Sequence, residues 1–289
     1  MLLFTGASGF LGKIAFPILS TKYNVTGLCH TNDYDGKFIP VEITDPEKIL
    51  KLLDNLKPNI IVHSAACREP DVCEKEPGFT DKLNVQATET ISGWCLKNNT
   101  KLVYISTDYV FDGINPPYNE NDPVSPINVY GKTKAAGESH VRSVPNHIIA
   151  RIPLQYGFSV SGEDSMISKI IDALKENKSY TINNNQVRYP TLSDDVAYAI
   201  LDLLDRNFTG TIHLSGPSEV TRYEIWKEVS NVFNLTAAKV IPTDKPVKQF
   251  APRPLNSRLS AELYDSLNLH KFHSFNEGLV HIKKMMRGY

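Results

Sequence analysis

The chain opens with M-L-L-F-T-G-A-S-G-F-L-G (residues 1–12), and this stretch decides the fold. Residues 1–5 form a short, continuously apolar run, which is typical of a strand buried on both faces. Glycines follow at positions 6, 9 and 12, and an apolar pattern with helical spacing runs from Lys13 to Leu19. A strand, a glycine turn and a helix in this order predict a cradle for a dinucleotide pyrophosphate. The alternative is a tight strand-to-helix turn that binds nothing.

The rest of the first half alternates apolar strands with helices. We expect strands at residues 24–29, 38–43, 59–63, 101–105 and 148–152, and helices at 45–57 and 81–97. Asp45 and Pro46 are suited to the N-cap and first position of the former helix. This order predicts an α/β fold, a Rossmann-type doubly wound parallel sheet with polar groups gathered at the strand ends.

The second half is less regular. Helices are expected at residues 166–175, 194–204 and 221–233, with a strand at 210–214. Asp194 and Asp195 are expected to cap the second of these helices, which runs to Leu204. We divide the chain into a dinucleotide-binding domain, residues 1–157 plus about 191–214, and a substrate-binding domain, about 158–190 plus 215–289. The second domain is smaller, C-terminal and partly interleaved with the first.

Composition excludes several classes of protein. The 289 residues are 41% apolar and 22% charged, with a formal net charge of −1, so bulk charge favours neither nucleic acid nor an anionic membrane. We find no apolar run of membrane-spanning length and no signal peptide before the first strand. The four cysteines form no C-x-x-C pair, and Cys67 and Cys73 lack companion metal ligands. We therefore expect a cytoplasmic protein, with reduced thiols and no metal site.

A catalytic group is expected where the fifth strand ends. I-S-T-D-Y-V-F-D-G (105–113) supplies the Thr107 hydroxyl, and Y-G-K-T-K (130–134) supplies Tyr130 and Lys134. Tyr130 and Lys134 are four residues apart, so on a helix they share one face. An ammonium beside a phenol should lower the phenol's pKa, which makes Tyr130 a proton donor for a carbonyl undergoing reduction.

The ends of other strands indicate how a cofactor would lie. The second strand ends at Cys29, followed by His30, Thr31 and Asn32, so no carboxylate stands at the strand end to repel a ribose 2′-phosphate. NADP(H) is therefore preferred to NAD(H), although both fit. Glu42 and Ile43 are placed to flank adenine. The small residues Ser64, Ala65 and Ala66 suit a backbone pressed against a flat cofactor, or simply tight packing of a strand on a helix.

Two further polar residues have two interpretations each. Arg68, in the polar loop 67–77, is a candidate anion contact or a solvated charge. Asn84, on the inner face of the helix at 81–97, is either a structural hydrogen-bonding residue or a ligand for a water near Lys134.

Together these residues resemble the extended short-chain dehydrogenase/reductase family. Its pattern is matched by Gly6-x-x-Gly9-x-x-Gly12, Asn84, Thr107 and Tyr130-x-x-x-Lys134. Within that family, residues 105–122 and A-P-R-P-L-N-S-R-L (251–259) are similar to the dTDP-4-dehydrorhamnose reductases. Many of those reductases carry tryptophan where this chain has Leu154, so the exact sugar is left open.

The resemblance implies a nucleotide-sugar substrate and a role for each residue. Thr107, Tyr130 and Lys134 would be catalytic, with Lys134 also holding the nicotinamide ribose. Asp108, Tyr109, Arg68, Arg188 and Arg253 would contact substrate, although a surface salt bridge is the alternative for each of the last two. The implied cofactor contacts are Gly6, Ser8, Gly9, Phe10, Leu11, Gly12, His30, Glu42, Ile43, Ser64, Ala65, Ala66, Asn84, Tyr130, Lys134 and Ile152.

A second resemblance implies a different function. R-E-P-D-V-C-E-K-E-P (68–77) and R-I-P-L-Q-Y-G (151–157) are similar to the regulatory beta subunit of methionine adenosyltransferase. The alternative is therefore a non-catalytic NADP-binding subunit whose partner is the catalytic subunit of that enzyme. The complete Thr–Tyr–Lys set favours the enzyme, and so does the C-terminal K-K-M-M-R-G-Y (283–289), which does not resemble that subunit's tail. A homodimer is compatible with either function.

Overall fold

The computed structural model describes residues 1–31, 36–158, 165–245 and 249–287, and in this part of the chain a seven-stranded parallel sheet forms the centre. The strands lie in the order β11-β6-β5-β4-β1-β2-β3. From β1, the chain first adds strands on one side (β2, β3) and then on the other (β4, β5, β6), so the switch point of the order lies between β1 and β4. This confirms the expected doubly wound fold. The strands are β1 (Leu2–Thr5), β2 (Val25–Cys29), β3 (Phe38–Pro40), β4 (Ile60–His63), β5 (Lys101–Thr107), β6 (His147–Ile152) and β11 (Gly210–His213).

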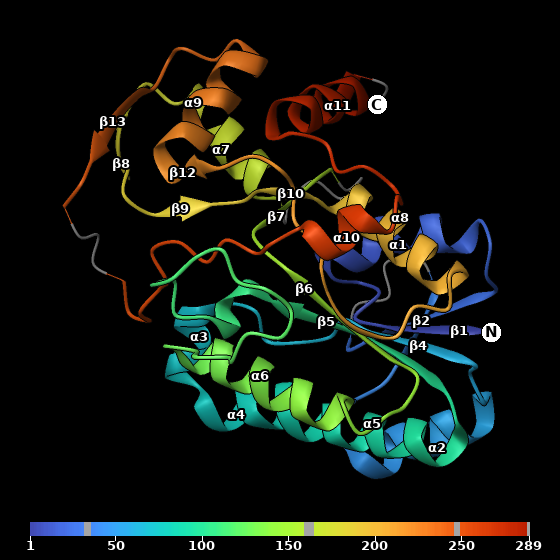
Figure 1. The fold of residues 1–289 in the computed structure, drawn as a ribbon. Helices are drawn as coiled ribbons and strands as arrows, with labels where there is room; N and C mark the ends of the chain where they lie inside the picture. The colour runs from blue at the N-terminus through green and yellow to red at the C-terminus, as the bar shows by residue number, and fades with distance from the viewer. Residues whose placement is uncertain (32–35, 159–164, 246–248, 288–289) are drawn as a thin grey trace.

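Helices cover both faces of the sheet (Figure 1). On one face, α1 (Phe10–Ser20) and α8 (Ser193–Asp205) pack together, and α10 (Glu262–Ser266) adds Tyr264 to their core. On the other face lie α2 (Pro46–Leu56), α5 (Ala87–Asn98) and α6 (Val129–Val141). As expected, the Asp45 carboxylate caps α2, accepting a hydrogen bond from the backbone N–H of Lys48 at 3.2 Å. Two apolar layers therefore hold the strand ends in fixed positions.

The connection between β4 and β5 differs from expectation. Residues 67–77, expected as a loop, contain the short helix α3 (Pro70–Lys75), and α4 (Pro77–Asp81) follows at once. Each helix begins with proline, whose fixed φ favours the first helical position. One turn of π-helix, Lys82–Gln86, then joins α4 to α5. The expected helix at 81–97 is therefore interrupted near its start.

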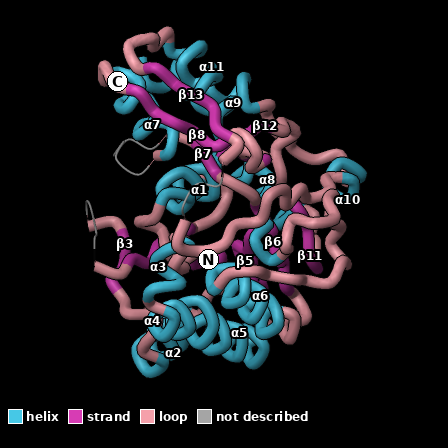
Figure 2. The backbone as a smooth tube through the Cα atoms, turned by 90° about the vertical axis from the view of Figure 1, so that its left-hand side faces the viewer, coloured by secondary structure: helices cyan, strands magenta, loops and turns pink. Residues whose placement is uncertain are grey.

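A smaller body stands over the strand ends (Figures 1 and 2). Its core gathers apolar residues of α7 (Met166–Lys175), α9 (Arg222–Phe233) and α11 (Phe275–Arg287). A capping box between Thr221 and Glu224 begins α9. The pairs are β8 (Ser179–Asn183) with β13 (Lys239–Thr243), β7 (Gln155–Tyr156) with β10 (Thr191–Leu192), and β9 (Val187–Arg188) with β12 (Val220–Thr221). The two-domain division stays our prediction, although Tyr264, assigned to the second domain, packs in the core of the first.

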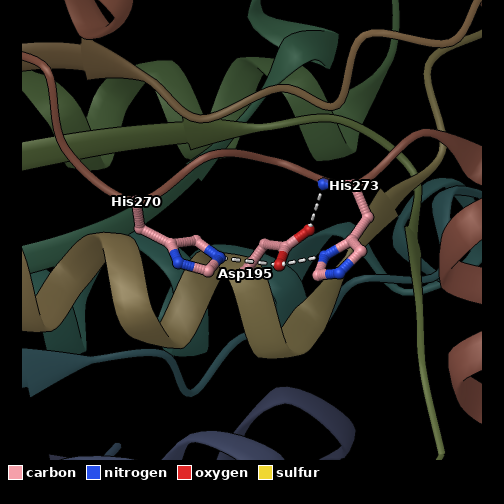
Figure 3. Close-up of side chains that lie close together, drawn as sticks. All are labelled: Asp195, His270 and His273. Carbon is pink, nitrogen blue, oxygen red and sulfur yellow. Dashed lines mark hydrogen bonds and ion pairs between the residues drawn. The ribbon is translucent and has the colours of Figure 1, made fainter.

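The two aspartates at the start of α8 do not act as caps. The N-cap is Leu192, and Asp195 instead accepts hydrogen bonds from the side chains of His270 and His273, both at 2.8 Å (Figure 3). Burial raises the pKa of Asp195, but the hydrogen bonds from both histidines outweigh it and the net pKa is lowered. Asp195 therefore ties the segment before α11 to the sheet domain.

A buried ion pair braces the strands nearest the expected catalytic group. The Arg151 guanidinium on β6 donates two hydrogen bonds to the Glu138 carboxylate on α6, at 2.9 and 2.8 Å. Ser106 on β5 donates to the same carboxylate at 2.6 Å. This network joins β5, β6 and α6, the three elements that carry Thr107, Tyr130 and Lys134 or lie beside them. Among the helices described, none is both long and apolar enough to cross a membrane.

Candidate active site

A cavity of about 970 Å³ lies at the carboxyl ends of the strands, below the smaller body. Of the residues that the sequence and the family resemblance predict for the site, all but Asn84 line it. They are Gly6, Ser8, Gly9, Phe10, Leu11, Gly12, His30, Glu42, Ile43, Ser64, Ala65, Ala66, Arg68, Thr107, Asp108, Tyr109, Tyr130, Lys134, Ile152, Arg188 and Arg253. The fold thus brings residues from across almost the whole chain to one surface.

The glycine turn is shaped by close backbone contacts. Gly6 has a φ of +72°, a conformation that favours glycine, and a Cβ on it would lie 2.9 Å from the Ala65 backbone nitrogen. A Cβ on Gly12 would lie 2.3 Å from the Gly6 carbonyl oxygen. Helix α1 can therefore pack directly on the turn and present its N-terminus to the cavity.

His30 and Glu42, which the sequence predicts beside an adenine, line one part of the cavity. Their side chains lie 2.8 Å apart, between His30 Nε2 and Glu42 Oε2. The Thr44 hydroxyl and backbone N–H also donate to Glu42 Oε1, at 2.7 and 3.1 Å. These hydrogen bonds, led by the Thr44 hydroxyl and including His30, lower the pKa of Glu42. Glu42 therefore fixes the loop after β3 as well as lining the site.

Asn84 lies behind the cavity wall, in the π-helical turn. Its Oδ1 accepts from the Cys67 backbone N–H at 2.8 Å, and its Nδ2 donates to the Cys67 carbonyl at 3.0 Å and to the Thr133 hydroxyl at 3.1 Å. Its side chain is therefore occupied by protein groups. The structural interpretation fits this geometry, in which Asn84 positions the segment that carries Arg68.

Thr107, Tyr130 and Lys134 meet on one wall of the cavity. Tyr130 lies in the first turn of α6, whose N-cap Asn128 accepts from the Gly131 N–H at 2.8 Å. Lys134 is buried, and its Nζ lies 3.8 Å from the centre of the Tyr104 ring. The spacing of four residues therefore places both side chains at the end of β5, as the sequence predicts.

The expected lowering of the Tyr130 pKa is not found. Burial raises the pKa of this phenol, and hydrogen bonding from the Thr107 hydroxyl opposes the rise only in part. Burial also lowers the pKa of Lys134 to about 7, against a partial opposing effect of Glu138. Desolvation is the largest influence on the pKa of both groups, because Lys134 is buried and Tyr130 is partly buried. Tyr130 therefore holds its proton firmly at neutral pH.

Asp108 is occupied by protein contacts. The Thr107 hydroxyl donates to its Oδ1 at 3.1 Å, and the Ser257 hydroxyl hydrogen-bonds to its Oδ2. Ser257 belongs to the segment A-P-R-P-L-N-S-R-L, so Asp108 anchors that segment beside Thr107. Burial raises the pKa of Asp108. It lines the cavity, and each of its carboxylate oxygens already accepts a hydrogen bond from a protein hydroxyl.

Three arginines line the other end of the cavity: Arg188, Arg222 and Arg253. Arg188 is buried and donates to the carbonyls of Val187 and Pro254, at 2.6 and 3.2 Å, so a surface salt bridge is ruled out for it. Arg253 does pair with Asp71, at 2.9 Å, while still lining the cavity.

The sequence analysis missed Arg222. The side chain of Arg222 is exposed, yet partial desolvation by the protein around it, followed by the charge of Arg188, lowers the pKa of Arg222, which shows that these two cations are close. Among the described residues, no carboxylate forms an ion pair with Arg188 or Arg222. The only sequence signal for Arg222 is its place directly after Thr221, at the start of an amphipathic helix. Nothing local indicates that this helix end faces the cavity.

These features define a class of protein. A glycine turn at the first strand, a serine–threonine strand end and a tyrosine–lysine helix beside one long cavity are those of an extended short-chain dehydrogenase/reductase. Within that class, the chain belongs to the family described as "RmlD substrate binding domain", whose model matches residues 1–287.

Relatives include both types of protein that the sequence resembles. The mouse methionine adenosyltransferase 2 subunit beta is 36% identical over 287 residues, covering 96% of this chain and 85% of that protein. The probable low-salt glycan biosynthesis reductase Agl14 of Haloferax volcanii is 29% identical, covering 88% of each. A crystal structure of the dTDP-4-dehydrorhamnose reductase of Bacillus anthracis in complex with NADP superposes with a TM-score of 0.88, at 28% identity and 98% coverage of both chains.

Proposed function

We propose that this protein is an NAD(P)H-dependent reductase of a nucleotide-linked 4-keto-6-deoxy sugar, of the dTDP-4-dehydrorhamnose reductase type. One observation carries the proposal. Thr107, Tyr130 and Lys134 line the same cavity as the glycine turn and as Arg188, Arg222 and Arg253, which we call the arginine cluster. The groups proposed as proton donor, cofactor cradle and anion site are therefore on one surface.

The residues at the glycine turn fit a dinucleotide. Side chains at Gly6 or Gly12 would collide with neighbouring backbone, so bare backbone faces the cavity beside the N-terminus of α1. A pyrophosphate bound there is stabilised by free N–H groups and the helix dipole. NADPH supplies the hydride when bound, and Lys134 would hold its nicotinamide ribose. The preference for NADP(H) over NAD(H) rests on the absence of a carboxylate directly after β2, since His30 stands there.

Proton transfer is assigned to Tyr130. Because its pKa is raised, it is protonated at neutral pH and can donate to the sugar's C4 oxygen as negative charge develops there. Thr107 lies beside it, and its hydroxyl donates to Asp108 at 3.1 Å in this structure. With substrate bound, this hydroxyl would turn from Asp108 and donate to the C4 oxygen instead. Lys134 supplies positive charge, which stabilises the tyrosinate left behind.

The nucleotide diphosphate is assigned to the arginine cluster. Arg188 and Arg222 are close cations without a carboxylate partner among the described residues, and a diphosphate would offset their repulsion. Tyr109, Arg68 and Leu154 complete the wall around the sugar. We also assign the protein to the cytoplasm, a reducing compartment, because Cys67 and Cys73 lie with their sulfurs 3.4 Å apart and are not joined by a disulfide.

The proposal is tested by mixing the purified protein with NADPH and a panel of 4-keto nucleotide sugars. We expect loss of the nicotinamide absorbance with at least one sugar. Absence of oxidation across the panel, while NADPH still binds, would reject catalysis.

A second function is favoured by one observation, the 36% identity to a methionine adenosyltransferase subunit. Under this alternative the protein binds NADP without turnover and attaches to the catalytic subunit. Sedimentation of a mixture with that catalytic subunit tests it. A stable complex together with an inactive sugar panel would favour the regulatory function.

A further inference from the structure

Two thiols lie together behind the arginine side of the cavity. The Cys73 Sγ, in α3, is 3.4 Å from the Cys67 Sγ, in the segment before that helix. Cys73 also hydrogen-bonds the Cys67 carbonyl at 3.4 Å. We propose that Cys67 and Cys73 form a reversible disulfide on exposure to peroxide, and that this bond alters the adjoining cavity.

The two thiols differ in a way that suits stepwise oxidation. Cys67 is partly exposed, whereas Cys73 is buried, so peroxide reaches Cys67 first. The hydrogen bond from Cys73 lowers the pKa of Cys67, and the same bond raises the pKa of Cys73. This shift favours the thiolate at Cys67, which is the reactive form of a cysteine. Cys73 is positioned as the resolving thiol.

The chemistry balances with hydrogen peroxide as the oxidant. The Cys67 thiolate attacks one peroxide oxygen, the O–O bond breaks, and Cys67 sulfenic acid and hydroxide form. The Cys73 sulfur then attacks the Cys67 sulfur and displaces hydroxide, which with the proton lost from Cys73 becomes water. Overall, two thiols and one peroxide give one disulfide and two waters, and two electrons pass from sulfur to oxygen.

The bond would move the cavity wall. The two sulfurs, 3.4 Å apart, must approach to about 2.05 Å to form the bond, by rotation of the side chains and movement of their segments. Asn84 holds both backbone groups of Cys67, and α3 carries Asp71, which binds Arg253. Arg68 and Glu69 follow Cys67 directly and line the cavity. Movement of these segments would therefore displace Arg68 on one side and Arg253 on the other.

The thiol pair is also within electrostatic reach of the catalytic wall. A negative charge at Cys73 would raise the pKa of Tyr130, so the two side chains are near each other. The Cys67–Cys73 pair is thus placed to link oxidation to the site.

Peptide mapping after a brief peroxide treatment tests the bond directly. We expect an intramolecular Cys67–Cys73 cross-link that dithiothreitol reverses, in wild type and in the control Cys95→Ala. In Cys73→Ser, which lacks the resolving thiol, we expect a sulfenic acid at Cys67 that dimedone traps. Irreversible oxidation of Cys67 in wild type, or no cross-link between the two residues, would overturn the proposal.

The functional consequence rests on the proposed function and is measured separately. Oxidised wild type should lose about ten- to a hundredfold in kcat/KM for the sugar, since a misplacement near 1 Å can cost that much. Dithiothreitol should restore it, and Cys67→Ser should be insensitive to peroxide. Unchanged kinetics in fully cross-linked protein would refute the link to the cavity while leaving the mapped bond standing. Peptide mapping gives the same answer even if no sugar is turned over.

Discussion

The two ends of the cavity are built in different ways. At the end with the glycine turn, where we propose that the cofactor binds, the turn and the strand ends are set by short, local sequence patterns. At the end with Arg188, Arg222 and Arg253, which we propose for the substrate, the side chains come from segments that meet only where the smaller body packs over the sheet. The comparison teaches that the first kind of site can be predicted from local spacing, whereas the second depends on long-range packing.

Replacing Tyr130 with phenylalanine is the clearest way to separate catalysis from cofactor binding. Loss of the proton donor should lower kcat by about 10²–10⁴-fold, the usual contribution of general acid catalysis. The fold should survive, because only one hydroxyl is removed. Affinity for NADPH, measured by fluorescence titration, should change little. Retained turnover would show that Tyr130 is not the donor.

This first prediction depends on residues that the sequence identifies without structural help. The Gly6–Gly12 turn and the Tyr130–Lys134 pair are local patterns, and the structure places them as expected. Lys134's effect on the Tyr130 pKa was predicted wrongly, because spacing shows proximity but not how deeply both groups are buried. Arg222 was missed, and the Asp195 contacts with His270 and His273 were misjudged as a cap, since both depend on segments distant in sequence.

The arginine cluster is tested by Arg222→Ala. Loss of a charged hydrogen bond costs about 1.5–3 kcal/mol, so KM for the nucleotide sugar should rise roughly ten- to a hundredfold. Affinity for NADPH should be unaffected, because Arg222 is at the other end of the cavity. Lys227→Ala, an exposed change on the same helix, is the matched control. If both substitutions raised KM for the nucleotide sugar equally, or if Arg222→Ala lowered only the affinity for NADPH, the assignment of Arg222 to the nucleotide-sugar site would be wrong.

The pH dependence sharpens the same comparison at the catalytic wall. Lys134, with a pKa of about 7, loses its proton as pH rises through that value. We expect kcat/KM for reduction to be steady below pH 7 and to fall above it, approaching tenfold per pH unit. A profile that stays flat well above pH 7 would show that the ammonium form is not required.

The smallest expected effect concerns the connection between the two bodies. Asp195→Asn should lower the free energy of unfolding by about 1–3 kcal/mol at neutral pH, because the histidine hydrogen bonds lose their charged acceptor. The pKa of Asp195 is lowered in the folded state, so the wild-type advantage is complete above pH ~4 and is lost as pH falls further. Urea unfolding at several pH values measures it. An advantage that does not vary with pH would contradict the assignment.

The central claim is that both ends of one cavity act on the same reaction. Transfer of deuterium from NADPH labelled at C4 of the nicotinamide tests it most directly, with the sugar product examined by mass spectrometry and NMR. We predict that one deuterium appears at C4 of the sugar with wild type, and far less with Tyr130→Phe. Binding of both ligands without any transfer of label would contradict the account and favour a regulatory protein.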